Sequence, residues 1–396
     1  MVKFSARDRL KLLAGGAAYL FGGCGGSTSL PVQSGTTVTP QLPPAGGNSP
    51  VSGLLRDTFR NNFQIGAALN NQRVTASDLS AQLADDQFSS ITPEWELKPD
   101  VIQPTPGVYN FSDADRVVDW ALDNGLVVRG HALLWHETTP DHFLQGTPTD
   151  IRLRLEDYIS TVVDYYRDRI QIWDVVNEVV SADIYRGSDG IGPDRRSNWY
   201  NAVGSADYID WAFNAARAAN PNAILMLNEY GTETPMKRDW MIEILRRLDT
   251  RGVPVDGVGH QFHLNLGSDY QDCLDAIDAV DNEFMGLINH ATEIDVSYYN
   301  DPGSCWDSQT NCEPDLGLNP PTDLLAQHAQ LMRDLFNGLA LRSTVESVTF
   351  WGVRDGDSWL NESPIRRSNH PLLFDRDGEP KPAFLAITDQ NYQIPS

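Results

Sequence analysis

Residues 172–180 read IWDVVNEVV, a run of apolar β-forming residues that is interrupted by a polar pair, Asn177 and Glu178. Valine and isoleucine in unbroken succession are typical of a strand that is buried on both faces of a parallel sheet. A carboxylate at the end of such a strand is unfavourable unless it is paired or holds a proton. The stretch therefore predicts a parallel sheet with chemistry at the carboxyl end of one strand.

Seven further β-rich runs occur along the chain, and amphipathic helical patterns separate most of them. The eight predicted strands are 64–69, 90–95, 127–135, 171–177, 224–228, 258–263, 287–294 and 347–353. The clearest helical patterns cover 112–124, 149–167, 211–220, 236–251 and 322–341. Strands and helices that alternate eight times predict an α/β protein of the (β/α)8 TIM barrel class. An open doubly wound sheet is the alternative, but no glycine-rich phosphate loop follows any of the runs.

The first 50 residues differ in composition from the rest. Residues 1–26 have a basic start and a short apolar run, which predicts a signal peptide or a lipoprotein signal with Cys24 as the lipidated residue. Residues 27–50 are rich in Gly, Ser, Thr and Pro and predict a flexible linker. Residues 51–396 are predicted to form the barrel domain. The protein is expected to be secreted or periplasmic, and it could be anchored to a membrane by a lipid on Cys24.

The net charge of the 396 residues is −24. Lys3, Arg7, Arg9 and Lys11 against Asp8 give the first 50 residues a charge of +3, which leaves −27 for the remainder. A body this acidic repels nucleic acid and anionic membranes and favours a neutral substrate. No protein partner is predicted, and the protein is expected to act as a monomer.

Four cysteines and one histidine motif bear on metals and disulfides. Cys305 and Cys312 lie seven residues apart in a polar loop and could form a disulfide in an exported protein, whereas Cys273 is expected to be a buried free thiol. His136 begins a stretch that fails the HExxH pattern, because Pro140 stands where the second histidine is needed. No metal site and no cofactor are therefore expected.

Polar and aromatic residues follow seven of the eight predicted strands, at the carboxyl ends where barrel enzymes place their active sites. In chain order they are Glu94, Lys98, His131, Trp135, His136, Asn177, Glu178, Asn228, Glu229, Gln261, His263, Glu293, Asp295, Trp351 and Trp359. Two carboxylates across a barrel mouth, with indoles that stack on sugar rings and amides that bind hydroxyls, indicate glycoside hydrolysis.

The same segments resemble family 10 of the glycoside hydrolases, the retaining endo-β-1,4-xylanases. The resemblance covers residues 54–387. It rests on the motifs GHALLWH (130–136), WDVVNE (173–178), RSNWYNAVG (196–204), HQFH (260–263), TEID (292–295), WGVRDGDSW (351–359) and PLLFDRDGEPKPAF (371–384).

This resemblance implies a role for each matching residue. Glu178 matches the general acid/base, Asn177 the residue that binds the 2-hydroxyl of the sugar being cleaved, and Glu293 the nucleophile. His263 matches the histidine that hydrogen-bonds the nucleophile and keeps it ionised. Other matches contact substrate: His131, Trp135 and Gln261 surround the cleaved sugar, and Glu94, Lys98, Trp351 and Trp359 bind on the glycone side. The implied substrate is xylan or a xylo-oligosaccharide.

One position departs from the family pattern. The family usually has Asn after the residue matching Glu94, and here Trp95 takes that place. An indole removes an amide donor and acceptor and adds a bulky apolar face, so Trp95 is expected to reshape the second glycone subsite. Action on short xylo-oligosaccharides or on aryl or steroid β-glycosides is therefore an alternative to action on xylan. A non-catalytic glycan-binding barrel is the alternative from another class, against which both Glu178 and Glu293 argue.

Several polar and aromatic residues are interpreted as structural. Asp174, Asp295 and Glu229 are expected to bind neighbouring protein groups, and Trp173, Trp199, Trp211 and Trp240 are expected to pack in the core or against helices. The segment 297–321, which contains Trp306, is expected to build part of the leaving-group side of the rim.

Overall fold

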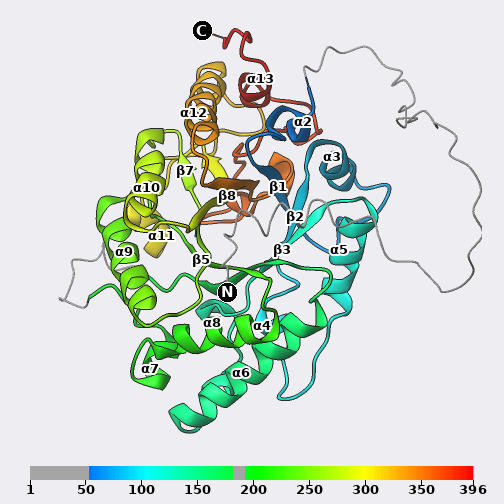
Figure 1. Ribbon diagram of the computed structural model, residues 1–396. Helices are drawn as coiled ribbons and strands as arrows, with labels where there is room; N and C mark the ends of the chain where they lie inside the picture. The colour runs from blue at the N-terminus through cyan, green and yellow to red at the C-terminus, as the bar shows by residue number, and fades with distance from the viewer. Residues whose placement is uncertain (1–52, 182–191, 396) are drawn as a thin grey trace, which may run out of the picture.

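The run that begins at Ile172 is strand β4 (Ile172–Asn177), one of eight parallel strands that close into a ring (Figure 1). The computed structural model describes residues 53–181 and 192–395. The other strands of the ring are β1 (Gln64–Leu69), β2 (Ser90–Pro93), β3 (Val127–His131), β5 (Ile224–Glu229), β6 (Gly257–His260), β8 (Ile288–Ser297) and β9 (Val345–Phe350). Pairing of β1 with β9 and of β6 with β8 closes the ring, so the chain is a (β/α)8 barrel and not an open sheet.

Helices surround the ring and cover the outer faces of its strands (Figure 1). The helices of the described residues are α2 (Leu55–Phe59), α3 (Leu79–Gln87), α4 (Pro99–Ile102), α5 (Ser112–Asp123), α6 (Pro148–Tyr165), α7 (Asn198–Val203), α8 (Asp207–Ala219), α9 (Pro235–Thr250), α10 (Tyr270–Glu283), α11 (Gly303–Ser308), α12 (Thr322–Ala340) and α13 (Pro382–Thr388), and not all of them cover strands. The five predicted helical segments correspond to α5, α6, α8, α9 and α12. Helix α6 begins with a capping box between Thr147 and Asp150, which satisfies amides of its first turn.

Two predicted strand boundaries are wrong in ways that concern function. The sixth run does not continue from 258 to 263, because Phe262 has a left-handed backbone (φ 53°) that separates β6 from a short strand, β7 (His263–Asn265). The seventh run does not end at 294, because β8 continues to Ser297 and pairs there with β7. Glu293 and Asp295 therefore lie within a strand and not beyond its end.

The barrel interior changes character along its axis. Ile172, Ile224, Met226 and Ile288 form a small apolar cluster near the amino ends of β4, β5 and β8. Two residues further along β4, the Asp174 carboxylate accepts a hydrogen bond of 3.0 Å from Arg129 of β3. The larger apolar core lies between the ring and the helices and includes Trp173 and Phe213. The interior therefore becomes more polar toward the carboxyl ends of the strands.

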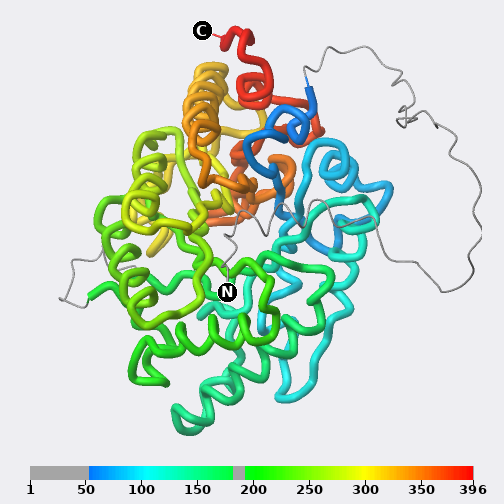
Figure 2. The backbone as a smooth tube through the Cα atoms, viewed as in Figure 1, coloured from blue at the N-terminus to red at the C-terminus, as the bar shows by residue number. Residues whose placement is uncertain are grey.

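The first and last described parts of the chain lie side by side, as the blue and red ends of the tube in Figure 2 show. Phe59 of α2 packs on Phe336 of α12 with ring centroids 5.1 Å apart. Across the described residues, no helix combines the length and the apolar composition needed to cross a membrane. The predicted signal and linker, residues 1–50, fall outside the described residues.

Candidate active site

Asn177 ends β4, and Glu178 follows it in a left-handed conformation with φ 58°. The pairing of β4 with β5 shifts by one residue between Asp174 and Val176, a bulge that changes the direction of the strand just before the pair. The Glu178 amide donates to the carbonyl of Asn228 at 2.9 Å, which fixes the backbone after the strand. Local backbone geometry therefore sets the direction of the Glu178 side chain.

Glu293 lies inside β8, and a second irregularity sits at this point. The register of β8 against β9 shifts between Ala291 and Ile294, so β8 contains one residue more than its partner over this stretch. The Glu293 side chain is buried, whereas that of Glu178 is partly exposed. Each carboxylate thus lies within or just after an irregularity in the pairing of its strand.

A chain of amide side chains joins the two carboxylates. Asn228 Nδ2 donates to Glu293 Oε1 at 2.6 Å and to Asn177 Oδ1 at 2.8 Å. Asn177 Nδ2 in turn lies 3.4 Å from Glu178 Oε1, and Gln261 Nε2 lies 3.3 Å from the same oxygen. The structure therefore brings Asn177, Glu178, Gln261 and Glu293 together in one site.

Glu293 is held in its ionised form. His263 Nε2 lies 3.3 Å from Glu293 Oε2, and His263 Nδ1 lies 3.0 Å from Asp295 Oδ1. Burial alone raises the pKa of Glu293, but the hydrogen bonds from His263 and Asn228 and the electrostatic effects of His131 and His263 together outweigh burial and lower it below the ordinary value. Burial likewise lowers the pKa of His263, yet Asp295 and Glu293 together raise it well above its usual value. The arrangement favours a histidinium beside a carboxylate.

Lys98 lies buried between two indoles. Its Nζ is 3.8 Å from the ring centroid of Trp95 and 4.5 Å from that of Trp135. Burial lowers the pKa of Lys98, while the carboxylates of Glu293, Glu94 and Glu178 act in the opposite direction. The Trp95 ring, 49% exposed, thus lies over the predicted site lysine and is not turned away into the following loop.

The remaining predicted ligands lie close to this group. Asn70 Nδ2 donates to Glu94 Oε2 at 2.9 Å, and burial raises the pKa of Glu94. His131 meets the Trp351 ring edge-on at 5.2 Å, and its Nδ1 lies 3.0 Å from Asp174. Trp359 Nε1 donates to Asp295 at 2.8 Å. Asp174 and Asp295 therefore bind neighbouring side chains, as expected.

A buried charged cluster lies beneath Glu178. Glu229 Oε1 forms an ion pair of 2.8 Å with Lys237 Nζ, and both side chains are fully buried. Glu229 Oε2 accepts a 2.8 Å hydrogen bond from the amide of Val180, two residues after Glu178. The structural interpretation of Glu229 is confirmed, and its specific task is to fix the backbone that carries Glu178.

Other structural predictions are also confirmed. Trp173 and Trp199 are buried, and Trp211 and Trp240 pack partly buried against the core. Cys305 and Cys312 form a disulfide. Cys273 is a buried free thiol.

Two contributors received no role from the sequence. Asn228 was noted at a strand end, but its position between Asn177 and Glu293 depends on long-range contacts. Asn70 directly follows β1, so its position at a strand end is the sequence signal that marks it as a member of the rim. Gly259 leaves room for Asn228, because a Cβ atom at that position would overlap the Asn228 amide oxygen.

Two carboxylates, amide donors and partly exposed indoles at the carboxyl end of a (β/α)8 barrel define a glycoside hydrolase. Residues 54–390 match the model of glycosyl hydrolase family 10. The chain belongs to this family.

Individual relatives match over most of their length. A thermostable celloxylanase from Thermoclostridium stercorarium is 38% identical over 356 residues, which cover 85% of this chain and 87% of the relative. The crystal structure of xylanase B from Clostridium stercorarium F9 superimposes with a TM-score of 0.77 at 37% identity and covers 85% of this chain and 99% of that one. An intracellular xylanase from Thermoanaerobacterium saccharolyticum, solved as a mutant with xylotriose, gives a TM-score of 0.74 at 31% identity over 86% and 99% of the two chains.

Proposed function

We propose that this protein is a retaining endo-1,4-β-xylanase in which Glu178 is the acid/base and Glu293 the nucleophile. The observation that carries the proposal is the amide chain through Asn177 and Asn228, which places two carboxylates in one site with different surroundings. Similarity to xylanases, one of them solved with xylotriose, supports xylan or a xylo-oligosaccharide as the substrate.

The proposed reaction is a double displacement. In the first step the Glu293 carboxylate bonds to the anomeric carbon, the glycosidic C–O bond breaks, and Glu178 gives its proton to the leaving oxygen. In the second step a water molecule attacks the same carbon, Glu178 takes the proton of the water, and the bond to Glu293 breaks. Each carboxyl group returns to its starting state, so no cofactor is consumed.

The surrounding groups have separate tasks in this proposal. His263 keeps Glu293 ionised, and Asn177 binds the 2-hydroxyl of the cleaved sugar. His131, Trp135 and Gln261 would bind the same sugar, while Glu94, Lys98, Trp351 and Trp359 would bind on the glycone side. Hydroxyl groups can donate to Glu94 and accept from Lys98, which suits a neutral polyol better than an anion.

Product stereochemistry tests the mechanism. A retaining enzyme has carboxyl groups about 5–5.5 Å apart and releases products with the anomeric configuration of the substrate. NMR spectra recorded during hydrolysis of xylohexaose are expected to show the β-anomer first. Initial release of the α-anomer would contradict the assignment of Glu293 as a nucleophile.

Trp95 supports a second candidate, a family 10 hydrolase that acts on short xylo-oligosaccharides or on aryl or steroid β-glycosides. Its indole covers Lys98 where the family pattern has a short amide. Comparing kcat/KM on xylan, xylotriose and aryl β-glycosides distinguishes the two candidates. A non-catalytic glycan-binding barrel predicts no turnover of a chromogenic xylobioside, so any turnover abolished by Glu293→Ala excludes it.

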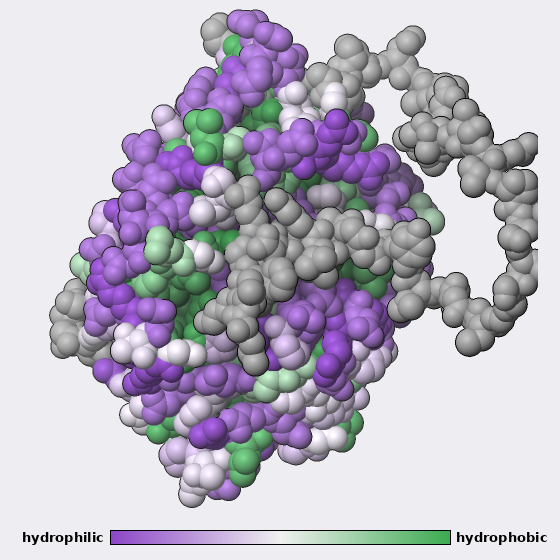
Figure 3. All heavy atoms as spheres, viewed as in Figure 1, coloured by the Kyte–Doolittle hydropathy of each residue, from purple (hydrophilic) through white to green (hydrophobic). Residues whose placement is uncertain are grey.

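We also propose that the protein is exported, to the periplasm or the exterior, either free or anchored through Cys24. The Cys305–Cys312 disulfide supports an oxidising compartment. A monomer is also proposed, since hydrophilic residues predominate among the coloured residues on the face seen in Figure 3. Fractionation of the producing cells, with mass analysis of the mature N-terminus and light scattering, tests these three points.

A further inference from the structure

The segment after β8 carries an exposed indole toward the site. Trp306 lies on α11 with 48% of its surface exposed, and its ring centroid is 5.9 Å from that of Trp359 at an angle of 45°. Trp359 is tied to the nucleophile through Asp295 and His263. Trp306 therefore contacts Trp359, which in turn bonds to the residues around Glu293.

The contact between Trp306 and Trp359 links this segment to the loop that follows β9. The segment 297–321 was predicted to build the leaving-group side, but its exposed indole lies beside Trp359, which the family resemblance places on the glycone side. In the ring of strands, β8 lies between β6 and β9, and Trp359 follows β9, so the contact with Trp359 places the Trp306 ring toward the β9 side. The position of Trp306 therefore favours the glycone half of the site.

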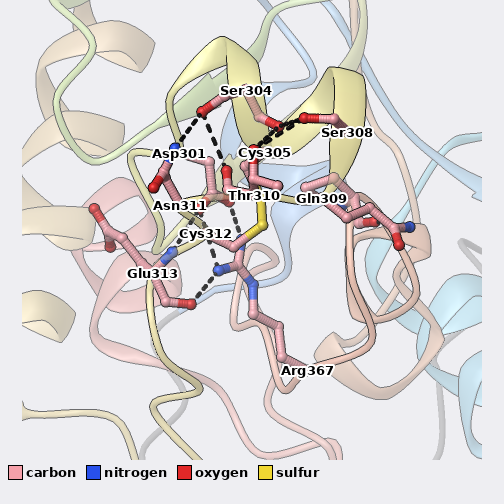
Figure 4. Close-up of a disulfide and its surroundings, with 11 residues drawn as sticks. Asp301, Ser304, Cys305, Ser308, Gln309, Thr310, Asn311, Cys312, Glu313 and Arg367 are labelled. Carbon is pink, nitrogen blue, oxygen red and sulfur yellow. Dashed lines mark hydrogen bonds and ion pairs between the residues drawn. A yellow bond between two sulfur atoms is a disulfide. The ribbon is translucent and has the colours of Figure 1, made fainter.

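The segment that carries Trp306 is held at both ends (Figure 4). The disulfide joins Cys305, the residue before Trp306, to Cys312. Arg367 Nη1 donates to Asp301 at 3.2 Å and to the carbonyl of Glu313 at 2.7 Å, and so bridges the two ends of the loop. An indole on such a support loses little conformational freedom when a ligand binds.

The surrounding contacts tie this loop to the segment after Trp359. Gln309 Nε2 donates to the carbonyl of Pro364 at 2.9 Å, and the Tyr299 hydroxyl donates to the carbonyl of Ser368 at 2.6 Å. The Arg367 guanidinium lies 3.6 Å from the centre of the Tyr299 ring. These contacts keep Trp306 and Trp359 in a fixed relation, so the two rings form one surface.

We propose that Trp306 is a substrate-contacting residue that extends the Trp359 surface and binds a further pyranose ring of a β-1,4-linked chain in the glycone half. An exposed indole offers a flat apolar face that fits the C–H face of a pyranose, and its N–H can donate to a hydroxyl. The inference rests on the proposed xylanase function and adds a residue that sets the preferred chain length.

The test compares Trp306→Ala and Trp306→Phe with the parent protein on an aryl β-xyloside and on xylobiose through xylohexaose. Loss of one stacking surface is expected to raise KM for the longer oligosaccharides by about 3- to 10-fold, with kcat changed less than 2-fold. Trp306→Phe is expected to recover most of the loss. The aryl xyloside, with a single sugar, is expected to react at the parent rate.

Met285→Ala serves as the matched control, because Met285 is a fully exposed apolar residue just before β8, at the opposite end of the barrel. It is expected to leave KM unchanged at every chain length. An equal KM for the parent and Trp306→Ala on all oligosaccharides would overturn the inference and leave the xylanase proposal intact. Absence of turnover in the parent protein would instead overturn the xylanase proposal.

The disulfide provides a second measurement. The double variant Cys305→Ser/Cys312→Ser retains the indole but frees the loop, so it is expected to raise KM for xylopentaose and xylohexaose in the same direction as Trp306→Ala. Adding Trp306→Ala to the double variant is expected to cause little further increase, because both changes act on one contact. Fully additive increases would show that the loop and the indole act separately and would contradict the proposal.

Discussion

Glu178 and Glu293 are both glutamates of one site, yet they differ in backbone conformation and in the side chains that hold them. Glu178 lies beyond its strand with φ 58°, and its nearest side-chain donors stand 3.3 and 3.4 Å away. Glu293 lies within its strand, accepts a 2.6 Å hydrogen bond from Asn228 and is paired with His263. A loosely held, partly exposed carboxyl suits repeated proton transfer, whereas a tightly held one suits a constant negative charge.

The left-handed backbone at Glu178 costs on the order of 1–3 kcal/mol for a residue that is not glycine. The amide of Glu178 is held by Asn228, and the amide of Val180 by the buried Glu229–Lys237 pair. Burial lowers the pKa of Lys237, and the neighbouring Glu229 counteracts this effect. The site therefore uses a buried ion pair to stabilise a strained residue.

Replacing each carboxylate by alanine gives the largest expected effect and separates the role of Glu178 from that of Glu293. Glu293→Ala should abolish turnover of all substrates, because no covalent intermediate can form. Glu178→Ala should lower kcat/KM on xylan by about 10²- to 10⁴-fold but largely spare formation of the intermediate from aryl xylosides whose leaving group needs no proton. Steady-state and burst kinetics on xylan and on 2,4-dinitrophenyl xylobioside measure both. Equal losses on the two substrates in Glu178→Ala would contradict the assignment.

The His263 contact tests how the charge of Glu293 is maintained. Since His263 helps to lower the pKa of Glu293, His263→Asn should raise that pKa. A higher pKa leaves less Glu293 ionised at a given acidic pH, so the acidic limb of the kcat/KM profile should move toward higher pH. The profile between pH 3 and 7 on an aryl xyloside measures the shift.

His142→Asn is the matched control, because His142 lies in the 3-10 helix Asp141–Leu144, and its Nε2 lies 3.3 Å from Gln103, which belongs to neither carboxylate's surroundings. It should leave the acidic limb in place. A limb that stays unmoved in His263→Asn would show that His263 positions Glu293 without affecting its ionisation.

Lys98 interacts electrostatically with both Glu178 and Glu293, and the Trp95 ring covers Lys98. Trp95→Asn is therefore expected to affect the surroundings of both carboxylates, with a smaller effect than the changes above. Restoring the amide should move the product pattern from xylotetraose and xylopentaose toward stronger use of the second glycone sugar. Relative cleavage rates are expected to change by about 3- to 10-fold. Chromatography of products at early times measures the pattern. The same products at the same relative rates in both proteins would assign Trp95 to packing alone.

The fold was accessible from sequence because burial on both faces leaves uninterrupted β-forming runs, and because polar residues gather at one end of each run. The same reasoning brought Glu178, Glu293 and Gln261 to one rim. The split between β6 and β7 could not be predicted in this way, because Phe262 is an apolar residue with no side-chain feature that favours its left-handed conformation.

The individual contacts between site residues could not be predicted from the sequence, because they join residues far apart in the chain. Asn228 bonds to Asn177, 51 positions away, and to Glu293, 65 positions away. The contact between Trp306 and Trp359 likewise depends on how two loops fold over each other, which neither loop encodes alone. Residue type and strand position predicted which residues belong to the site. Only the folded barrel shows which of these residues contact one another.

The pairing of β1 with β9 has a consequence for how the protein forms. Gln64 of β1 is paired with Ser347 of β9. Because β1 leaves the ribosome early, nearly the whole domain must be synthesised before its second neighbouring strand exists. Closing so long a loop is entropically costly and comes late in folding. Until then both edges of the incomplete sheet present unpaired amides and carbonyls to other chains. Because completion of the ring needs the C-terminal strand, a chain truncated before Val345 would expose a permanent sheet edge and tend to aggregate.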